Sequence, residues 1–256
     1  MTRTPLEPRR RILITGASAG LGAEMARIWA RQGRDLALCA RRLGELEQLR
    51  EELLRARPGL TVTVHALDVL DHEAVDAVFA EAATALGGLD RVVVNAGVAQ
   101  SGSLGLDSAA GNRATAQTNF VGAVHQAEAA VRLFRASGAG HLAFISSMSA
   151  LRGMGGAMTV YAASKAGVSA LAEGLRSDLW DTPIRVTAVH PGYIATSMAE
   201  EFEKAFFVAG PQRGARSIVR AIERERARAY VPTVPWAFVR WPMRLLPLGV
   251  FRRAGG

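Results

Sequence analysis

The sequence predicts a single α/β domain built on a doubly wound parallel sheet. Short apolar runs rich in β-branched residues alternate with longer amphipathic stretches, and only a few residues connect them. This alternation is typical of parallel strands linked by crossover helices. A chain of 256 residues, 49% of them hydrophobic, is also long and apolar enough to bury one sizeable core. We therefore expect residues 1–233 to form one domain, with residues 234–256 as a C-terminal extension.

The first predicted unit is an apolar strand at residues 11–15, a glycine-rich turn at 16–22 and an amphipathic helix at 23–32. Glycines in such a turn let the backbone approach a diphosphate, whose charge faces the N-terminus of the helix. A linker or an ordinary tight turn would also use glycine. The strand before the turn and the helix after it favour a dinucleotide site.

A second apolar run, residues 35–40, ends in Arg41 and Arg42. This is where a nucleotide-binding unit places the residue that meets the adenosine ribose. An acid there binds the 2′-hydroxyl of NAD, whereas an arginine suits the 2′-phosphate of NADP. Because no Asp or Glu stands at this strand end, we predict NADP(H), with Arg41 favoured over Arg42 and Ser18 as a helper. A solvated arginine pair is the alternative.

The remaining elements continue the alternation and bring polar groups to the strand ends. Asp68 and Asn95 fall at carboxyl ends of strands, where such sheets bind ligands, although Asp68 would equally suit a helix cap. Asn119 lies inside a predicted helix, so it marks either a local kink or a functional amide. We expect helices at 43–57, 71–86, 108–137, from about Tyr161 to 180, and at 211–228, and strands at 60–66, 91–95, 141–146, 184–189 and 230–233.

Tyr161 and Lys165 stand four residues apart, so on a helix they share one face. A Tyr hydroxyl titrates near pH ~10 and exchanges protons near neutrality only if something stabilises the phenolate, as a neighbouring cation does. The spacing by itself fits an ordinary helix. However, Lys165 and Lys204 are the only lysines of the chain, so Lys165 is less readily explained as an ordinary solvated surface residue.

Composition excludes several other classes of protein. A single cysteine, Cys39, leaves no intrachain disulfide and favours a reducing, cytoplasmic compartment. The apolar run after the N-terminal arginines is too short for the core of a signal peptide. The histidines show no metal-ligand spacing, and we expect His190 to pack beside the pocket. We predict no metal site and no nucleic-acid partner.

Taken in order, these residues resemble the shorter, single-domain branch of the short-chain dehydrogenases/reductases over roughly residues 10–232. The matching pieces are the turn 15–22, Asp68, residues 95–97, Asn119, residues 146–147, 161–165 and 191–192, and Thr196. The resemblance implies a seven-stranded Rossmann-like sheet. It also implies a homodimer or homotetramer that pairs through the helices holding Asn119 and Tyr161.

The resemblance assigns a role to each site residue. Tyr161 would act as general acid/base, Lys165 would lower its pKa and hold the nicotinamide ribose, and Ser147 would bind the substrate oxygen. Asn119 would anchor a water that relays protons to Lys165. The implied cofactor-binding residues are Gly16, Ser18, Gly20, Leu21, Gly22, Arg41, Arg42, Asp68, Val69, Asn95, Ala96, Gly97, Tyr161, Lys165, Pro191, Gly192, Ile194 and Thr196.

Two departures from the family pattern stand out. The family serine usually lies one position closer to the tyrosine, where this chain has Met148. A one-residue insertion in the following glycine-rich loop leaves Ser147 catalytic, with Ser149 as the fallback. The second departure is the C-terminal end, which lacks the Asp-Gly-Gly turn of many relatives and so weakens an assignment as a fatty-acid-synthesis reductase.

The C-terminal end also carries the charge of the molecule. Residues 212–256 hold ten arginines against two glutamates, which accounts for the whole formal net charge of +8. Residues 234–251 are apolar, with two tryptophans near two arginines, and three prolines rule out one continuous membrane-spanning helix. This segment either packs on the domain or a partner subunit and walls the pocket, or contacts anionic lipid as a peripheral anchor.

We therefore expect an NADP(H)-dependent oxidoreductase that interconverts a carbonyl and a secondary alcohol on an apolar or amphipathic small molecule. Met154, Met158, Phe202, Phe206 and Phe207 would shape the substrate pocket. The alternatives are reduction of a 3-oxoacyl thioester on an acidic carrier, and a non-catalytic NADP(H)-binding regulator on the same fold.

Overall fold

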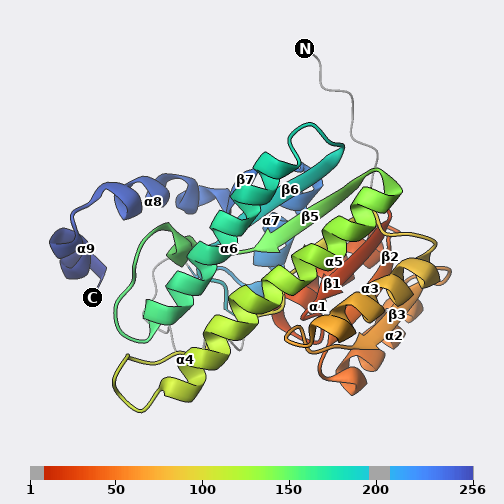
Figure 1. Cartoon of the computed structure of the whole chain (residues 1–256), viewed down its shortest axis with the longest axis horizontal. Coiled ribbons are helices and arrows are strands. Elements are labelled where there is room, and N and C mark those ends of the chain that lie inside the picture. Colours follow the sequence, from red (N-terminus) through yellow and green to blue (C-terminus); the bar gives the residue numbers. More distant parts are fainter. Residues whose placement is uncertain (1–8, 196–207, 256) are drawn as a thin grey trace.

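Seven parallel strands form the central sheet in the order β3-β2-β1-β4-β5-β6-β7 (Figure 1). The computed structural model describes residues 9–195 and 208–255. Sheet order and strand direction confirm the predicted doubly wound fold. The strands are β1 (Arg11–Thr15), β2 (Asp35–Ala40), β3 (Val62–Ala66), β4 (Arg91–Val94), β5 (Gly140–Ile145), β6 (Ile184–Pro191) and β7 (Arg228–Val231).

Helices cover both faces of the sheet, so its central strands read as unbroken apolar runs. Within β1, Ile12 and Ile14 pack against α1 (Gly20–Arg31), α2 (Leu43–Ala56) and α7 (Pro211–Glu223). Leu13 points to the other face, which α3 (His72–Leu86), α5 (Gly122–Ser137) and α6 (Met158–Asp178) cover. Between β4 and α5 lies the short α4 (Ala109–Ala116), and a 3₁₀ turn (Met148–Leu151) follows β5.

The predicted helix 108–137 is interrupted at its centre. Residues Gln117–Val121 form a π-helical turn that separates α4 from α5, and Asn119 is buried in this turn. A π turn inserts an extra residue and reorients the side chains around it. The local kink, one of the two alternatives for Asn119, is therefore present.

The predicted helix 211–228 is too long. α7 ends at Glu223, and Arg228 already begins β7. The reason lies at Glu225, whose backbone is left-handed with φ 46° and whose carboxylate accepts a 2.8 Å bond from Nε of Arg9. A left-handed residue ends an α-helix, and here a distant ion pair holds it in place.

The C-terminal extension forms two helices, α8 (Thr233–Leu245) and α9 (Leu248–Gly255), separated near Pro247. The segment is therefore not one continuous helix, as predicted, although Pro242 lies inside α8. Both helices lie at the end of the molecule beyond β7, at the left in Figure 1. Among the described residues, no helix is long and apolar enough to cross a membrane.

Candidate active site

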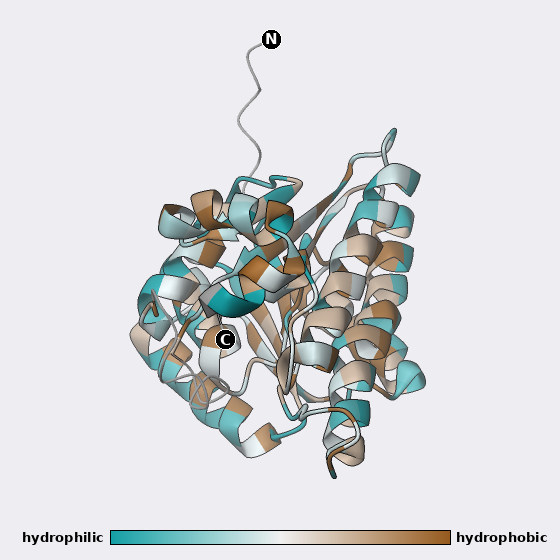
Figure 2. Ribbon diagram, turned by 90° about the vertical axis from the view of Figure 1, so that its left-hand side faces the viewer, coloured by the Kyte–Doolittle hydropathy of each residue, from teal (hydrophilic) through white to brown (hydrophobic). Residues whose placement is uncertain are grey.

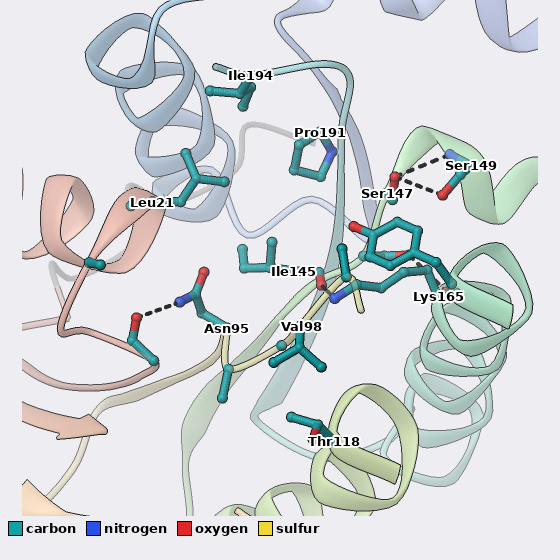
Figure 3. Close-up of a pocket in the computed structure, with 18 of the residues that line it drawn as sticks. Leu21, Asn95, Val98, Thr118, Ile145, Ser147, Ser149, Lys165, Pro191 and Ile194 are labelled. Atoms are coloured by element: carbon teal, nitrogen blue, oxygen red, sulfur yellow. Dashed lines mark hydrogen bonds between the residues drawn. The ribbon is translucent and has the colours of Figure 1, made fainter. Parts of the chain in front are cut away.

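A cavity of about 630 Å³ opens at the carboxyl ends of the central strands. The glycine turn before α1 lines one end, and residues of α6, the 3₁₀ turn and α8 line the other. Figure 3 shows Leu21 and Asn95 on one side of this space and Ser147, Ser149 and Lys165 on the other. The cavity therefore lies at the carboxyl ends of the strands, where the sequence predicts the ligand site.

The glycine turn depends on close backbone packing. Gly16 has φ 63°, and a Cβ there would lie 2.8 Å from Cα of Ala96, while a Cβ at Gly22 would collide with the carbonyl oxygen of Gly16. The Asn95 amide donates to the carbonyls of Thr15 (2.9 Å) and Gly16 (3.2 Å). Asn95 thus braces the turn, and it also lines the cavity where its cofactor contact is predicted.

The N-terminus of α1 fits the diphosphate of a dinucleotide. Its N-cap, Ala19, has no side chain that accepts from the helix, and the first turn contains no acid. The free N–H groups at a helix start favour an anion. Ser18, Gly20 and Leu21 line the cavity here, whereas Gly22 serves the packing of the turn behind it.

Arg41 and Arg42 line the cavity beyond β2 but differ in their contacts. Arg42 donates to Oγ of Ser18 (3.1 Å) and pairs with Glu45 (2.9 Å). Within the described residues, the exposed Arg41 has no hydrogen bond or ion pair. Its guanidinium is therefore free to take a phosphate, which suits the predicted preference for Arg41.

Asp68 is the one carboxylate among the described residues that line the cavity. It accepts a 3.0 Å bond from the backbone N–H of Leu70, while Asp71 caps α3 by accepting from Ala74. The alternative role of Asp68 as the helix cap is wrong, because its neighbour Asp71 fills that position. Asp68 and Val69 remain at the cavity wall.

Tyr161 and Ser147 both line the cavity, and their hydroxyl groups are hydrogen-bonded to each other. Burial of the phenol raises the pKa of Tyr161, while a hydrogen bond from Ser147 acts in the opposite direction. Ser147 in turn accepts two bonds from Ser149, one from its N–H (3.2 Å) and one from its hydroxyl (2.9 Å). With both acceptor positions of Ser147 occupied, its own proton is directed away from Ser149.

Lys165 is buried one helical turn from Tyr161, with Nζ 5.9 Å from the centroid of the Tyr161 ring. Its ammonium donates to the Ile145 carbonyl (2.9 Å), and burial lowers the pKa of Lys165 to about 8. The expected lowering of the Tyr161 pKa is absent from this geometry. Desolvation of the phenol outweighs the other effects on Tyr161.

Asn119 lies behind Gly97 rather than in the cavity. Its Oδ1 accepts from the N–H of Val98 (2.8 Å), and its Nδ2 donates to the Val98 carbonyl (2.9 Å) and to Ser164 (3.2 Å). A Cβ at Gly97 would lie 2.9 Å from Oδ1 of Asn119 and 3.4 Å from Nζ of Lys165. Glycine at position 97 therefore lets the amide and the ammonium approach each other.

Several functional residues escaped the sequence analysis. Trp236 and Met243 reach the cavity from α8 and pack with the buried Met148, and Tyr193 meets Trp236 edge-on. A Cβ at Gly192 would collide with the Trp236 indole. Only the apolar character of residues 234–251 signalled this wall, which confirms the interpretation in which the extension packs on the domain. Met154 and Met158 also line the cavity, as predicted.

Other predictions have mixed outcomes. His190 is buried and packs against Tyr230 (ring centroids 5.0 Å apart), as expected. The described part of the chain contains no cluster of side chains that would hold a metal ion. Ala96, Pro191 and Ile194 line the cavity, whereas Thr196, Phe202, Phe206 and Phe207 lie outside the described residues.

Comparisons with known proteins agree with this geometry. The family model described as short chain dehydrogenase matches residues 10–205. An uncharacterized oxidoreductase of Mycobacterium tuberculosis is 47% identical over 245 residues, covering 96% of this chain and 97% of the relative. Another, from Myxococcus xanthus, is 38% identical over 193 residues, 74% of each chain. The crystal structure of levodione reductase matches with a TM-score of 0.79 and 25% identity, covering 87% of this chain and 95% of that one.

Proposed function

We propose that this chain, which belongs to the short-chain dehydrogenase/reductase family, is an NADP(H)-dependent oxidoreductase that interconverts a carbonyl and a secondary alcohol. One observation carries the proposal. The Tyr161 phenol, the Ser147 hydroxyl and the Lys165 ammonium line the same cavity as the glycine turn at the start of α1. A nicotinamide cofactor laid along that cavity supplies the hydride, and the protein supplies position and a proton.

Tyr161 is the proposed proton donor. Its raised pKa keeps the phenol protonated near neutral pH, which is the form needed to protonate a carbonyl oxygen as its carbon accepts hydride. Ser147 donates its hydroxyl proton to the same oxygen and stabilises the negative charge that develops there. Lys165 stabilises the phenolate that Tyr161 becomes. Asn119 anchors a water that relays a proton to Lys165, and Tyr161 regains its proton by this route.

Ser149 positions Ser147 for this role. Because the N–H and hydroxyl of Ser149 both donate to Oγ of Ser147, the Ser147 proton points toward Tyr161 and the cavity.

The proposed substrate is apolar or amphipathic. The cavity wall near Tyr161 consists of thioethers and aromatic rings with few polar groups, and such walls bind apolar molecules. The side chains that form this wall are Met148, Met154, Met158, Tyr193, Trp236 and Met243. Since two of them come from α8, we also propose that residues 234–256 belong functionally to the catalytic domain 1–233.

The test follows NADPH absorbance with a panel of ketones and aldehydes, using Tyr161→Phe as the control. We expect turnover by the wild type and a fall in kcat of roughly 10²–10⁴-fold in the variant, with NADPH binding retained. Binding of NADPH without turnover of any carbonyl would favour a regulator. A preference for NADH over NADPH would refute the role given to Arg41.

A second candidate is reduction of a 3-oxoacyl thioester on an acidic carrier protein. The exposed face of α7 favours it, because Arg213, Arg216 and Arg220 present three positive charges there. Adding acetoacetyl thioesters to the panel separates the two candidates, since thioester-only turnover would support the carrier. Light scattering of the purified protein measures whether it forms the homodimer or homotetramer that the family suggests.

A further inference from the structure

Helix α8 is apolar on two opposite faces. Trp236 and Met243 are buried against the cavity wall. Phe238, Trp241 and Leu245 follow one another at spacings of three and four residues, so they share the other face. Their exposed fractions are 70%, 54% and 74%. An exposed apolar face of this kind, opposite the face that packs on the domain, is typical of a helix that contacts a second apolar surface.

Helix α9, which follows α8 in the chain, exposes a further apolar side chain, Leu248, to 68%. Three exposed arginines border the apolar side chains. We call the set the C-terminal patch: Phe238, Trp241, Leu245, Leu248, Arg244, Arg252 and Arg253. In Figure 2 the side of the molecule with the C-terminus faces the viewer, and hydrophobic and hydrophilic residues alternate along its helices. Residues 226–256 hold six arginines and no Asp or Glu, so the patch is uniformly basic.

Contacts from the catalytic domain hold the patch in place. Arg152 donates to the carbonyls of Met243 (3.1 Å) and Leu246 (2.9 Å), and its guanidinium lies 4.3 Å from the centroid of the Phe251 ring. Arg240 lies between the rings of Tyr230 (4.9 Å) and Trp241 (5.0 Å). The domain therefore presents the patch in one arrangement.

We propose that the C-terminal patch docks on an anionic lipid surface. Trp and Phe insert at the boundary between headgroups and acyl chains, and arginines beside them pair with lipid phosphates. The charge of the patch decides between this occupant and a second copy of the chain. Two copies meeting through the same patch would bring arginines together with no carboxylate in either segment, which costs free energy.

This docking goes beyond the proposed reaction and has a consequence for it. Trp236 and Met243 line the cavity from the inner face of the same helix whose outer face carries the patch. A docked protein would therefore hold the apolar wall of its substrate cavity next to the bilayer.

The test is co-sedimentation of the full chain with phosphatidylcholine vesicles prepared with and without phosphatidylglycerol. We expect the wild type to pellet only with the anionic vesicles, and less at high salt. The variant Phe238→Ser/Trp241→Ser/Leu245→Ser should partition at least about tenfold more weakly. Its matched control is Leu104→Ser/Leu106→Ser/Trp180→Ser, which removes three exposed apolar side chains from other surfaces and should pellet like the wild type.

A charge series completes the experiment. Arg244→Glu/Arg252→Glu/Arg253→Glu should abolish pelleting, whereas Arg213→Glu/Arg216→Glu/Arg220→Glu on α7 makes the same charge change and should leave most of it. Circular dichroism melting checks that every variant folds. The proposal would be overturned if the wild type did not pellet with anionic vesicles, or if the patch variants pelleted with them as much as the wild type does. A second result would also overturn it. If neither the wild type nor the apolar patch variant binds lipid, and light scattering shows that the wild type forms an oligomer that the variant does not, the patch contacts a second copy of the chain.

Discussion

The two ends of the sheet treat buried charge in opposite ways. At the amino end, Arg91 opens β4 and is 1% exposed, and its guanidinium pairs with Glu223. Its Nε also donates to Nδ1 of the buried His141 (2.9 Å), whose Nε2 meets Thr187 (2.9 Å). At the carboxyl end, Lys165 is also buried, but within the described residues its ammonium makes no ion pair and donates its hydrogen bond to the carbonyl of Ile145.

The surroundings of the amino-end cluster complete its pairing. Glu223 accepts from Nε1 of Trp29 (2.7 Å), and Glu225 accepts from Arg9. Burial lowers the pKa of His141 well below its usual value, so the ring stays neutral and its Nδ1 accepts a hydrogen bond from Nε–H of Arg91. Each buried charge here has a counter-charge, as a stable interior requires.

Lys165 has no counter-charge among the described residues, and its lowered pKa shows that burial disfavours its charged form. The two ends of the sheet therefore differ in whether a buried charge is stabilised by an ion pair. Paired charges stabilise the interior at the amino end, and the charge without a counter-charge at the carboxyl end is the one to which we propose a catalytic role. Five expected outcomes test this contrast and the proposed roles at the carboxyl end, from the largest effect to the smallest.

Replacing Arg91 by Met should destabilise the protein by about 3–5 kcal/mol, because Glu223 would lose its ion pair and the buried Glu225 would keep only Arg9 as a cationic partner. Guanidinium unfolding measures this loss. The exposed Arg135 on α5 offers the control, and Arg135→Met should change stability by less than about 0.5 kcal/mol. A loss at Arg91 as small as at Arg135 would remove the contrast between the two ends.

Replacing Lys165 by Met should lower kcat roughly 10²–10⁴-fold without lowering stability, because it removes a buried charge that has no counter-charge. Steady-state kinetics and thermal melting give the two readouts. A variant that lost several kcal/mol of stability would show that Lys165 contributes to the fold as Arg91 does.

The lowered pKa of Lys165 can be tested by comparing how the stabilities of the wild type and of Lys165→Met depend on pH. Its folded value of about 8 lies below its ordinary value of 10.5. Between these pH values the unfolded state binds more protons, so the unfolding free energy of the wild type, relative to Lys165→Met, should rise with pH. The gain approaches about 3 kcal/mol near pH 10.5, since one pKa unit corresponds to ~1.4 kcal/mol. A flat difference between pH 8 and 10.5 would contradict it.

Replacing Arg41 by Gln should raise the KM for NADPH about tenfold to a hundredfold and leave the KM for NADH and the stability unchanged, because an exposed cation without a protein partner is lost. Arg42→Gln is the matched comparison. Since Arg42 already bonds Ser18 and Glu45, its effect on NADPH should be smaller. The reverse order would move the phosphate contact to Arg42.

Replacing Ser149 by Ala should lower kcat only about three- to tenfold, with KM less affected, because hydrogen bonds that orient Ser147 are weakened or lost. Ser149→Thr keeps the hydroxyl and should restore most of the rate. Ser147→Ala should cost more than Ser149→Ala. If the order of the two alanine variants were inverted, Ser149 would be the catalytic serine.

Features set by neighbouring residues were predictable. The observed β1 and β2 coincide with the predicted strands at 11–15 and 35–40, because continuous apolar runs between polar residues leave little ambiguity. The glycine turn and the shared face of Tyr161 and Lys165 also follow from local spacing. The strand at 141–146 shifted by one residue to Gly140–Ile145, which is a typical error at element ends.

Features that join distant residues were not predictable. The left-handed Glu225 that shortens α7 depends on Arg9, and the π turn at Asn119 accompanies its bonds to Val98 and Ser164. Trp236 lies over Gly192 although more than forty residues separate them in the sequence. None of these contacts leaves a periodic pattern in the sequence.

The sequence by itself determined the sheet, the cofactor turn and the Tyr161–Lys165 pair, because each rests on residues a few positions apart whose spacing obeys helix and strand geometry. Only the tertiary structure decided that Ser149 orients Ser147, that α8 walls the cavity, and that Arg91 is paired while Lys165 is not. Burial and pairing depend on which side chains the fold brings together from different elements. The pKa of each buried group depends on the same neighbours, so it too belongs to the folded protein.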